Sequence, residues 1–395
     1  MTEAFLPKVD GIVTMLTKTV ECLRRSGHEV LIFAPSGGPE EIFGAEVVSV
    51  PSVAFPLYPE LRLALPRASM RKKLEQFRPD LLHLFEPALL GVGGLYYGDI
   101  LDIPLVISYH TNLPAYLRYY KLGAIQNLTW KLMRIRHDYA DVNLCTSTAM
   151  LDDLHSHGVQ RLAIWQRAVD ANRFSPGARS EEMRNRLTDG HPSSPLLLYV
   201  GRLSAEKDIA QLREVLTALP GTRLAIVGDG PLRHTLERHF KNTPAHFSGY
   251  LSGDALAAAY ASADLFILPS KTETLGLVLL EAQASGCPVI ACRAGGVPDA
   301  IQDGVTGCLF EPGDVSGLVD TVRRALACPG CLEPIRLQAR RDVEDRNWEE
   351  ATEQLVRYYA DAVWNHPPKK APAPQSTMRK VSSRVAVRML CRLLP

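Results

Sequence analysis

The 395-residue chain carries 44 Lys and Arg against 43 Asp and Glu, and 46% of its residues are hydrophobic. This length and composition fit a soluble globular protein of two domains. The near-zero net charge disfavours nucleic acid as a partner, because binding to a phosphate backbone calls for a basic excess. No apolar run reaches the roughly 18 residues of a membrane-spanning helix and no signal peptide is recognised, so we expect a cytoplasmic protein.

The first half of the chain alternates helix and strand patterns. Apolar residues at helical spacing run from Ile12 to Leu23, and Ser26-Gly27 ends that helix before a strand at 30–33. Further short apolar strands are predicted at 47–50, 81–85, 105–109 and 142–145. Because this alternation is typical of a parallel sheet covered on both faces, residues 1–190 are predicted to form a Rossmann-like domain.

One strand of that domain is missing from the pattern. The chain opens with Met1–Pro7, and no apolar strand precedes the first predicted helix. The first strand of a doubly wound sheet is usually internal, so its loss would expose backbone hydrogen-bonding groups of its neighbours. We therefore expect a first domain that lacks its first strand, through a misplaced start or a truncation.

The second half repeats the alternation after a Pro- and Ser-rich linker at 191–195. Strands are predicted at 196–200, 224–227, 265–268 and 289–292. Residues 191–345 are predicted to form a second Rossmann-like domain, and a helix within 346–366 is expected to pack back on the first domain. The predicted fold class is therefore α/β, with two Rossmann-like domains facing a cleft.

The eight cysteines are scattered through apolar segments, which predicts free thiols rather than a disulfide framework. Cys328-Pro-Gly-Cys331 has the spacing of a redox motif. No second pair or histidine couple accompanies it, so we interpret it as an ordinary surface turn.

The sharpest motif runs from Ser270 to Gly276, directly after a predicted strand. Open α/β sheets bind ligands at the carboxyl ends of their strands, and a helix that begins near Thr274 would direct N–H groups at a phosphate. Glu273 and Glu281 are eight residues apart, about two helical turns, so both carboxylates are expected along one side of the ligand. One would hold sugar hydroxyls and the other a ribose; ordinary surface acids are the alternative.

Two cations follow another strand of the same half. Arg202 and Lys207 lie in the segment Gly201–Lys207 and suit a diphosphate. Negative charge develops on a diphosphate as its sugar leaves, so fixed cations stabilise the transition state more than the ground state. Surface cations without a ligand are the competing interpretation, and Gly228–Pro231 is a weaker signal because such glycines often only permit a tight turn.

The first half offers three further candidates. Gly11 closes the segment Pro7–Gly11, which precedes the N-terminus of a predicted helix, and gives a flexible position beside a second phosphate contact. His110 closes the fourth strand and would hydrogen-bond a sugar hydroxyl, with a structural histidine as the alternative. His83 lies inside an apolar strand and is predicted to be a satisfied core histidine.

Together these motifs resemble family 4 of the retaining glycosyltransferases. The resemblance spans nearly the whole chain and is carried by Gly201–Lys207, Val227–Pro231, Glu273–Glu281 and Ala294–Asp299. Further segments look like the bacterial sulfolipid synthases, which move sulfoquinovose from its UDP form onto diacylglycerol. Those segments are Phe5–Ile12, Pro56–Glu60, Ser108–Pro114, Trp165–Asp170 and Ser270–Glu281.

The resemblance implies that residues 1–190 form the acceptor-side domain and residues 191–345 the nucleotide-sugar-binding domain. It also implies a UDP-sugar donor, no tightly bound cofactor and no metal site. Arg202 and Lys207 would grip the diphosphate, and Glu281 would hold the ribose. The residues implied to contact the donor are Gly11, Arg202, Lys207, Glu273, Thr274, Leu275, Gly276 and Glu281. The implied catalytic set is His110, Glu273, Arg202 and Lys207, with His110 on the transferred sugar. Departure and attack on one sugar face would explain retention, and a double displacement stays open.

The tail 367–395 is basic and holds no acid. Arg384, Arg388 and Arg392 are four residues apart and would form one face of a short helix on an anionic membrane. This predicts a peripheral protein on the cytoplasmic face of a membrane, as suits a diacylglycerol acceptor. A disordered solubilising tail is the alternative.

Three other functions remain open at this point. Transfer of glucose or mannose to another lipid or glycan would use the same scaffold and the same phosphate grip. A UDP-sugar epimerase would need no acceptor, and an inactive nucleotide-sugar-binding protein would bind the donor without turnover.

Overall fold

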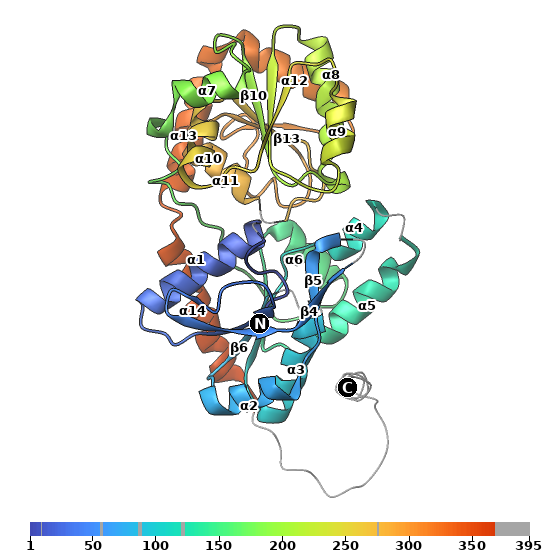
Figure 1. The fold of residues 1–395 in the computed structure, drawn as a ribbon, viewed down its shortest axis with the longest axis vertical. Coiled ribbons are helices and arrows are strands. Elements are labelled where there is room, and N and C mark those ends of the chain that lie inside the picture. The colour runs from blue at the N-terminus through green and yellow to red at the C-terminus, as the bar shows by residue number, and fades with distance from the viewer. Residues whose placement is uncertain (9, 56–57, 86–88, 120–122, 275, 368–395) are drawn as a thin grey trace, which may run out of the picture. The chain divides into compact units, whose positions relative to one another are not determined.

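The computed structural model describes residues 1–8, 10–55, 58–85, 89–119, 123–274 and 276–367 (Figure 1). It divides into two compact units, each with a hydrophobic core of its own. The first unit comprises residues 1–117, 122–166 and the C-terminal segment from Glu349, and the second comprises residues 118–121 and 167–348. The Pro- and Ser-rich segment 191–195 lies inside the second unit, directly before its first strand.

The second unit is built on a six-stranded sheet in the order β12-β11-β10-β13-β14-β15, and every pairing is parallel. The strands are β10 (Leu196–Val200), β11 (Arg223–Val227), β12 (Ala245–Gly249), β13 (Leu265–Leu268), β14 (Val289–Cys292) and β15 (Cys308–Phe310). All residues of β10, β13 and β14 are buried. These runs are apolar throughout because helices cover both faces of the sheet.

Helices α7, α10, α11 and α13 lie on one side of this sheet, and α8, α9 and α12 lie on the other (Figure 1). The α-helices of the unit are α7 (Glu181–Leu187), α8 (Leu212–Ala218), α9 (Arg233–His239), α10 (Gly253–Ser262), α11 (Leu277–Ala284), α12 (Val315–Ala327) and α13 (Glu333–Glu344). The short 3-10 turns are η2 (Pro176–Ala178), η3 (Ala205–Lys207), η4 (Ile209–Gln211) and η5 (Pro329–Leu332).

The first unit has a parallel four-stranded sheet in the order β6-β7-β8-β9, a three-stranded sheet in the order β1-β3-β2, and an antiparallel pair, β4-β5. The strands are β1 (Leu31–Pro35), β2 (Glu41–Ile42), β3 (Ala45–Val50), β4 (Ser52–Phe55), β5 (Tyr58–Ala64), β6 (Leu82–Phe85), β7 (Leu105–Ser108), β8 (Val142–Cys145) and β9 (Leu162–Ile164).

Two residues connect the two larger sheets of this unit. The Thr2 amide donates to Phe33 O of β1 at 3.1 Å, and the Phe85 amide of β6 donates to Met1 O at 2.9 Å. Thr2 also forms a parallel bridge with Phe85. Met1 and Thr2 therefore stand between β1 and β6 as a minimal strand, at the position where sequence reasoning expected a strand to be missing.

The helices of the first unit are α1 (Gly11–Arg25), α2 (Ala68–Phe77), α3 (Leu89–Leu101), α4 (Leu113–Tyr119), η1 (Gly123–Ile125), α5 (Gln126–His137), α6 (Thr148–Ser156) and α14 (Trp348–Asn365). The C-terminal helix α14 runs beside α1 (Figure 1), and an ion pair between Arg25 and Glu349 at 3.7 Å connects them. The Trp165 indole donates to Ala351 O at 2.9 Å, and the Tyr358 hydroxyl donates to Ile164 O at 3.0 Å. These contacts place α14 on the first unit.

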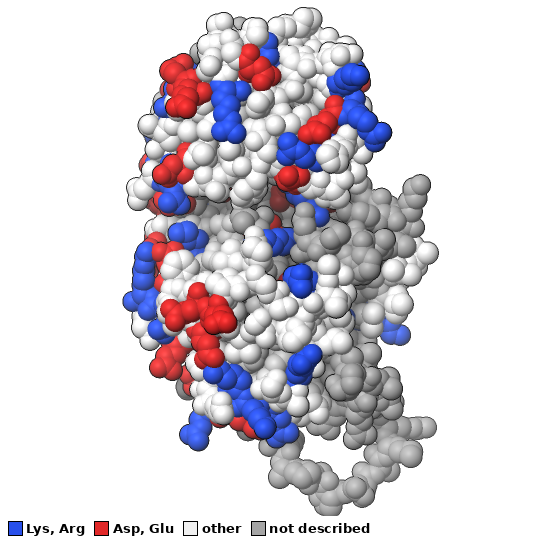
Figure 2. Space-filling view, in the orientation of Figure 1, with Lys and Arg blue, Asp and Glu red and all other residues white. Residues whose placement is uncertain are grey.

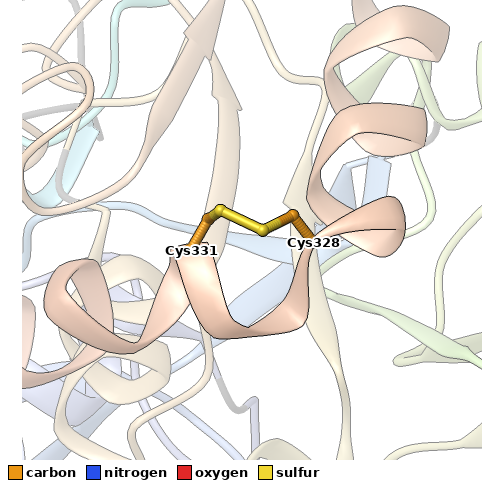
Figure 3. Close-up of a disulfide and its surroundings, with 2 residues drawn as sticks. All are labelled: Cys328 and Cys331. Atoms are coloured by element: carbon orange, nitrogen blue, oxygen red, sulfur yellow. A yellow bond between two sulfur atoms is a disulfide. The ribbon is translucent and has the colours of Figure 1, made fainter.

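The structure corrects the cysteine prediction at one pair. Cys328, at the end of α12, and Cys331, in η5, form a disulfide (Figure 3). Their Cα atoms are 5.4 Å apart, within the range that a disulfide needs, because the turn folds the two residues toward each other. The expectation of free thiols is confirmed for Cys22, Cys145, Cys287, Cys292 and Cys308.

Basic and acidic side chains are interspersed over the face seen in Figure 2. Within the described ranges, no helix is both long and apolar enough to cross a bilayer. The basic cluster predicted between Lys369 and Arg392 lies outside the described residues.

Candidate functional site

The candidate site of the second unit is built from loops that follow neighbouring parallel strands. The loop after β10 lies against the loop after β11, because the amide of Leu203 donates to Asp229 O at 2.9 Å. A Cβ on Gly228, which has a φ of +130°, would stand 2.0 Å from Gly201 O. Glycine is therefore required at Gly228 for this close backbone approach.

The loops after β13 and β14 meet in the same way. The amide of Gly296 donates to Glu273 O at 2.7 Å, and a Cβ on Gly295 would stand 2.3 Å from the same oxygen. Because Gly295 has a φ of +56°, both its backbone conformation and the available space select glycine. The carbonyl of Glu273 is thus fixed by the β14 loop.

Lys207 and Glu273 form an ion pair, with Lys207 Nζ 2.7 Å from Glu273 Oε2. The side chains are only 15% and 12% exposed, so solvent screens the pair weakly. Hydroxyls of Ser270 and Thr272 both donate to Glu206 O at 3.4 Å, which holds the two strand-end loops together. The two predicted residues with opposite charge therefore belong to one cluster.

Each partner of this pair keeps the other charged. Burial by itself would lower the pKa of Lys207, but the Glu273 carboxylate outweighs burial and the pKa is raised. Burial would likewise raise the pKa of Glu273, but the ammonium of Lys207, with help from the Gly276 amide, brings that pKa below its usual value. The site therefore holds a fixed ammonium ion beside a fixed carboxylate.

Glu273 lies in the loop before α11, which corrects one step of the sequence reasoning. The helix begins at Leu277 rather than near Thr274, so helical spacing does not place Glu273 and Glu281 on one face. Glu273 Oε1 instead accepts the Gly276 amide at 3.1 Å, and Gly276 is in the left-handed region with a φ of +60°. Thr274 is buried in this loop, and Leu275 lies outside the described residues.

Glu281 points to a different partner within the second unit. The Tyr260 hydroxyl donates to Glu281 Oε2 at 2.9 Å. Burial raises the pKa of Glu281 to about 7, against the opposing effect of the Tyr260 hydrogen bond. Near neutral pH this carboxyl is therefore poised to become a stronger acceptor when further donors, such as vicinal hydroxyls, reach it.

Arg202 is half-buried at the end of β10, and its carbonyl accepts the Tyr199 hydroxyl at 3.0 Å. This hydrogen bond fixes the backbone of Arg202 beside the loop that carries Lys207. The predicted cation thus starts from an anchored position at the strand end.

Sequence reasoning did not single out Arg167 as a site residue. Its guanidinium is 7% exposed and donates to Gly296 O of the β14 loop at 3.4 Å. Burial lowers the pKa of Arg167 to about 10, while the carboxylates of Asp299 and Glu273 oppose that shift. Its position in the family-like segment Trp165–Asp170 was the signal that could have identified it.

In the first unit, His110 follows β7 and is 2% exposed. Its Nε2 lies 2.8 Å from Ser108 Oγ, and its ring stacks on Phe85 at a centroid distance of 5.2 Å. Burial lowers the pKa of His110 to about 4, with a small opposing effect from Asp10. His110 is therefore a neutral hydrogen-bonding group at physiological pH.

Gly11 is the first residue of α1. Asp10 caps this helix, because its Oδ1 accepts the amides of Ile12 at 3.0 Å and Val13 at 2.9 Å. Lys8 pairs with Asp10 at 2.6 Å. The Asp10 carboxylate thus already occupies part of the N-terminus of α1, beside Gly11.

His83 is hydrogen-bonded at both ring nitrogens, which confirms a satisfied core histidine. Its Nδ1 lies 2.7 Å from the Tyr359 hydroxyl and its Nε2 lies 3.0 Å from Ser108 Oγ. Within the described part of the chain, no three His, Cys, Asp or Glu side chains gather in a way that would hold a metal ion.

The comparisons with known proteins identify the chain's relatives. Residues 184–344 match the model described as glycosyl transferases group 1, and residues 9–173 match the model described as Glycosyltransferase Family 4. The sulfoquinovosyl transferase SQD2 of Arabidopsis thaliana is 40% identical over 367 residues, which cover 90% of this chain and 72% of that protein. The chain belongs to glycosyltransferase family 4.

This glycosyltransferase is also 39% identical to a GDP-mannose-dependent alpha-mannosyltransferase of Mycobacterium tuberculosis, over 365 residues that cover 90% of this chain and 94% of the relative. Among solved structures, Anabaena Alr3699/HepE in complex with UDP-glucose matches with a TM-score of 0.74 at 18% identity, covering 91% of this chain and 98% of that one. The predicted family and the two-domain α/β fold, GT-B, are confirmed.

Proposed function

We propose that this enzyme transfers sulfoquinovose from UDP-sulfoquinovose to diacylglycerol and retains the anomeric configuration of the sugar. The observation that carries the proposal is the 40% identity with a sulfoquinovosyl transferase across 90% of the chain. The segments that look like the sulfolipid synthases support the same donor, and they support diacylglycerol as the acceptor.

The donor's diphosphate is the natural ligand of the cation cluster in the second unit. Lys207 would bind it as a point charge, and Arg202 would add a guanidinium from the same loop after β10. Because the bond from the sugar to the diphosphate breaks heterolytically, these cations stabilise the charge that the leaving group gains. Glu273 holds Lys207 at 2.7 Å and so keeps the ammonium in place before the donor arrives.

The other predicted site residues would each contact a different part of the donor. Glu281 would accept hydrogen bonds from the ribose hydroxyls, which favour its ionised form and bring down a pKa that burial has raised. Glu273, with the backbone of Thr274, Leu275 and Gly276, would hold the sugar and phosphate. His110 would contact the transferred sugar, and Gly11 would allow close approach at the start of α1.

No carboxylate nucleophile is needed in this scheme. Departure of the diphosphate and attack by the diacylglycerol hydroxyl on the same face of the sugar gives retention directly. The proton of the attacking hydroxyl then passes to the leaving phosphate oxygen, which becomes more basic as the bond breaks.

A mannosyltransferase that uses GDP-mannose is the second candidate. The Mycobacterium tuberculosis relative favours it, because its identity of 39% is nearly the same and the match covers 94% of its length. The cation cluster would bind the diphosphate of either donor. Contacts to the nucleotide base and to the sugar therefore decide which donor the enzyme uses.

The experiment supplies labelled UDP-sulfoquinovose, UDP-glucose or GDP-mannose together with diacylglycerol vesicles. We expect a labelled sulfolipid from the sulfonated donor and loss of that product with Glu273→Ala. Equal folding of the variant, checked by circular dichroism, keeps the control valid. Preferential transfer from GDP-mannose or UDP-glucose would overturn the sulfolipid assignment and leave the family unchanged.

A further inference from the structure

A continuous chain of hydrogen bonds runs through the first unit from helix α14 to His110. The Tyr359 hydroxyl lies 2.7 Å from His83 Nδ1, His83 Nε2 lies 3.0 Å from Ser108 Oγ, and Ser108 Oγ lies 2.8 Å from His110 Nε2. Tyr359 is 276 positions from His83 in the sequence, so the C-terminal helix supplies one end of a chain whose other end is a candidate catalytic residue.

Both histidines of this chain are neutral near pH 7. Burial lowers the pKa of His110 to about 4, and burial, the N-terminal ammonium and His110 lower the pKa of His83 well below its ordinary value. A neutral imidazole carries one N–H and one bare nitrogen. Ser108 is buried, and the two Nε2 atoms are the acceptors that the structure offers its single hydroxyl proton. If the Ser108 oxygen accepted from both rings, that proton would have neither ring as an acceptor, which is unfavourable for a buried donor. Ser108 therefore donates to one ring and accepts from the other.

Only two directions of donation satisfy that condition. In one, Tyr359 donates to His83, His83 donates to Ser108, and Ser108 donates to His110. In the other, His110 donates to Ser108, Ser108 donates to His83, and His83 donates to the Tyr359 oxygen. The two directions place the proton of His110 on different ring nitrogens, Nδ1 in the first and Nε2 in the second.

The phenol at the end of the chain decides between these directions. Burial raises the pKa of Tyr359, so the phenol keeps its proton. Among the described residues, His83 Nδ1 is the partner that the structure gives the Tyr359 hydroxyl. If His83 donated to the phenol oxygen, the phenol proton would lose this acceptor, and an unmade hydrogen bond from a buried donor is unfavourable.

We propose that Tyr359 is a positioning residue that sets the tautomer of His110 through His83 and Ser108, so that His110 carries its proton on Nδ1. The inference deepens the proposed function and rests on it for the role of His110. With Nε2 committed to Ser108, the Nδ1–H is the group with which His110 donates to an oxygen of the transferred sugar.

Helix α14 also holds a residue that serves as a matched control for Tyr359. Tyr358 is the neighbour of Tyr359, and its hydroxyl donates to Ile164 O at 3.0 Å, outside the relay. Tyr359→Phe and Tyr358→Phe each remove one hydroxyl from α14, so a general loss of helix packing affects both, whereas a tautomer effect belongs to Tyr359→Phe.

The test is nitrogen-15 NMR of the full chain with labelled histidine side chains, in which the His110 signals are assigned from a His110→Gln spectrum. We expect the wild-type His110 to be protonated at Nδ1 and bare at Nε2. Tyr359→Phe should lower the ratio of the Nδ1–H to the Nε2–H tautomer by about fivefold, the equivalent of one typical hydrogen bond, and Tyr358→Phe should leave it unchanged. Ser108→Ala, which interrupts the hydrogen-bond chain between the two histidines, should shift the ratio in the same direction.

A wild-type His110 protonated at Nε2 would overturn the proposal, as would equal ratios in the two Tyr variants. Transfer kinetics give a second measurement: Tyr359→Phe should lower kcat by about fivefold with little change in the donor KM, and Tyr358→Phe should not. If the tautomer behaves as expected but the enzyme transfers none of the tested sugars, the proposed function fails and the positioning role of Tyr359 stands.

Discussion

Lys207 Nζ lies 2.7 Å from Glu273 Oε2, although the two residues are 66 positions apart in the chain. Lys207 follows β10 and Glu273 follows β13, and these two strands are neighbours in the sheet. The strand order, rather than sequence proximity, therefore brings the cation and the carboxylate together at the carboxyl ends, where open α/β sheets bind their ligands.

Removal of one partner of this ion pair is expected to affect stability and activity differently. Lys207→Met leaves Glu273 buried without its cation, so the free energy of unfolding should fall by about 3 kcal/mol. Adding Glu273→Gln removes the stranded charge and should recover most of that loss, while transfer stays reduced by about 100-fold in both variants. Urea unfolding and the transfer assay measure the two effects.

Lys271→Met is the control for this pair. Lys271 lies in the same loop and pairs with Asp208 at 3.2 Å, but its side chain is 35% exposed. We expect less than about 1 kcal/mol of destabilisation and near-normal transfer. A double variant as unstable as Lys207→Met would show that the stranded charge is not the cause.

Gly295→Ala should disrupt the loop that fixes Glu273. The new Cβ would stand 2.3 Å from Glu273 O, and the φ of +56° disfavours any side chain. We expect a loss of more than about 2 kcal/mol in the second unit, and weaker binding of UDP in calorimetry. Gly330→Ala is the control, since nothing lies within 4 Å of its added Cβ. Unchanged UDP affinity in Gly295→Ala would contradict the role given to this loop.

The first unit should lose stability in acid because of buried histidines. Burial lowers the pKa of His110 and of His137 from 6.5 to about 4 each. Between those values the unfolded chain binds protons that the folded chain does not, so stability rises with pH across the window and is lost as pH falls from about 6.5 to 4. Each group contributes roughly 3 kcal/mol over the full window.

Urea unfolding followed by the fluorescence of Trp130 and Trp165, both buried in the first unit, measures this pH dependence. His137→Gln should flatten the slope between pH 4 and 6.5. His234→Gln, at a side chain that is 94% exposed, should leave the slope as it is. An identical slope in His137→Gln and the wild type would rule out the buried histidine as the source.

A strand added ahead of Met1 should stabilise the first unit. Met1 and Thr2 already connect β1 to β6, and the Met1 ammonium donates to His83 O at 2.7 Å. Burial lowers the pKa of this ammonium to about 6, so its stability contribution falls as pH decreases from 8 to 6. A four-residue extension of valine and isoleucine would continue the ladder on both sides and move the terminal ammonium away from this buried position.

We expect the extension to raise the free energy of unfolding by about 2 kcal/mol at pH 7. It should also remove the Met1 contribution to the pH dependence between 6 and 8 and leave that of the buried histidines. An extension of glycine and serine with the same length is the control. If both extensions have the same effect, backbone pairing between β1 and β6 does not continue beyond Met1.

The hydrophobic periodicity of the sequence predicted most strands of the two larger parallel sheets, because fully buried parallel strands such as β10 and β13 form continuous apolar runs. The antiparallel pair β4-β5 and the short strands β2, β9, β12 and β15 were not predicted. These strands are short or half-exposed, so their patterns resemble loops.

Motifs predicted which residues to examine at the site but not how they are arranged. Glu273 was expected on a helix face, yet its loop is shaped by Gly295, which is 22 positions later. The Tyr260 partner of Glu281 and the Tyr359 end of the His110 chain depend on tertiary packing that no local spacing records. The prediction of free thiols was wrong for Cys328 and Cys331, because spacing alone does not report the distance across a turn.

A competition in one reaction tests the proposed donor specificity of this enzyme. UDP-sulfoquinovose, UDP-glucose and GDP-mannose are supplied at equal concentration with diacylglycerol vesicles, and the glycolipid products are counted by mass spectrometry. We expect sulfoquinovosyl diacylglycerol as the main product, in proportion to a higher kcat/KM for that donor. A mannosyl or glucosyl lipid as the main product would contradict that specificity.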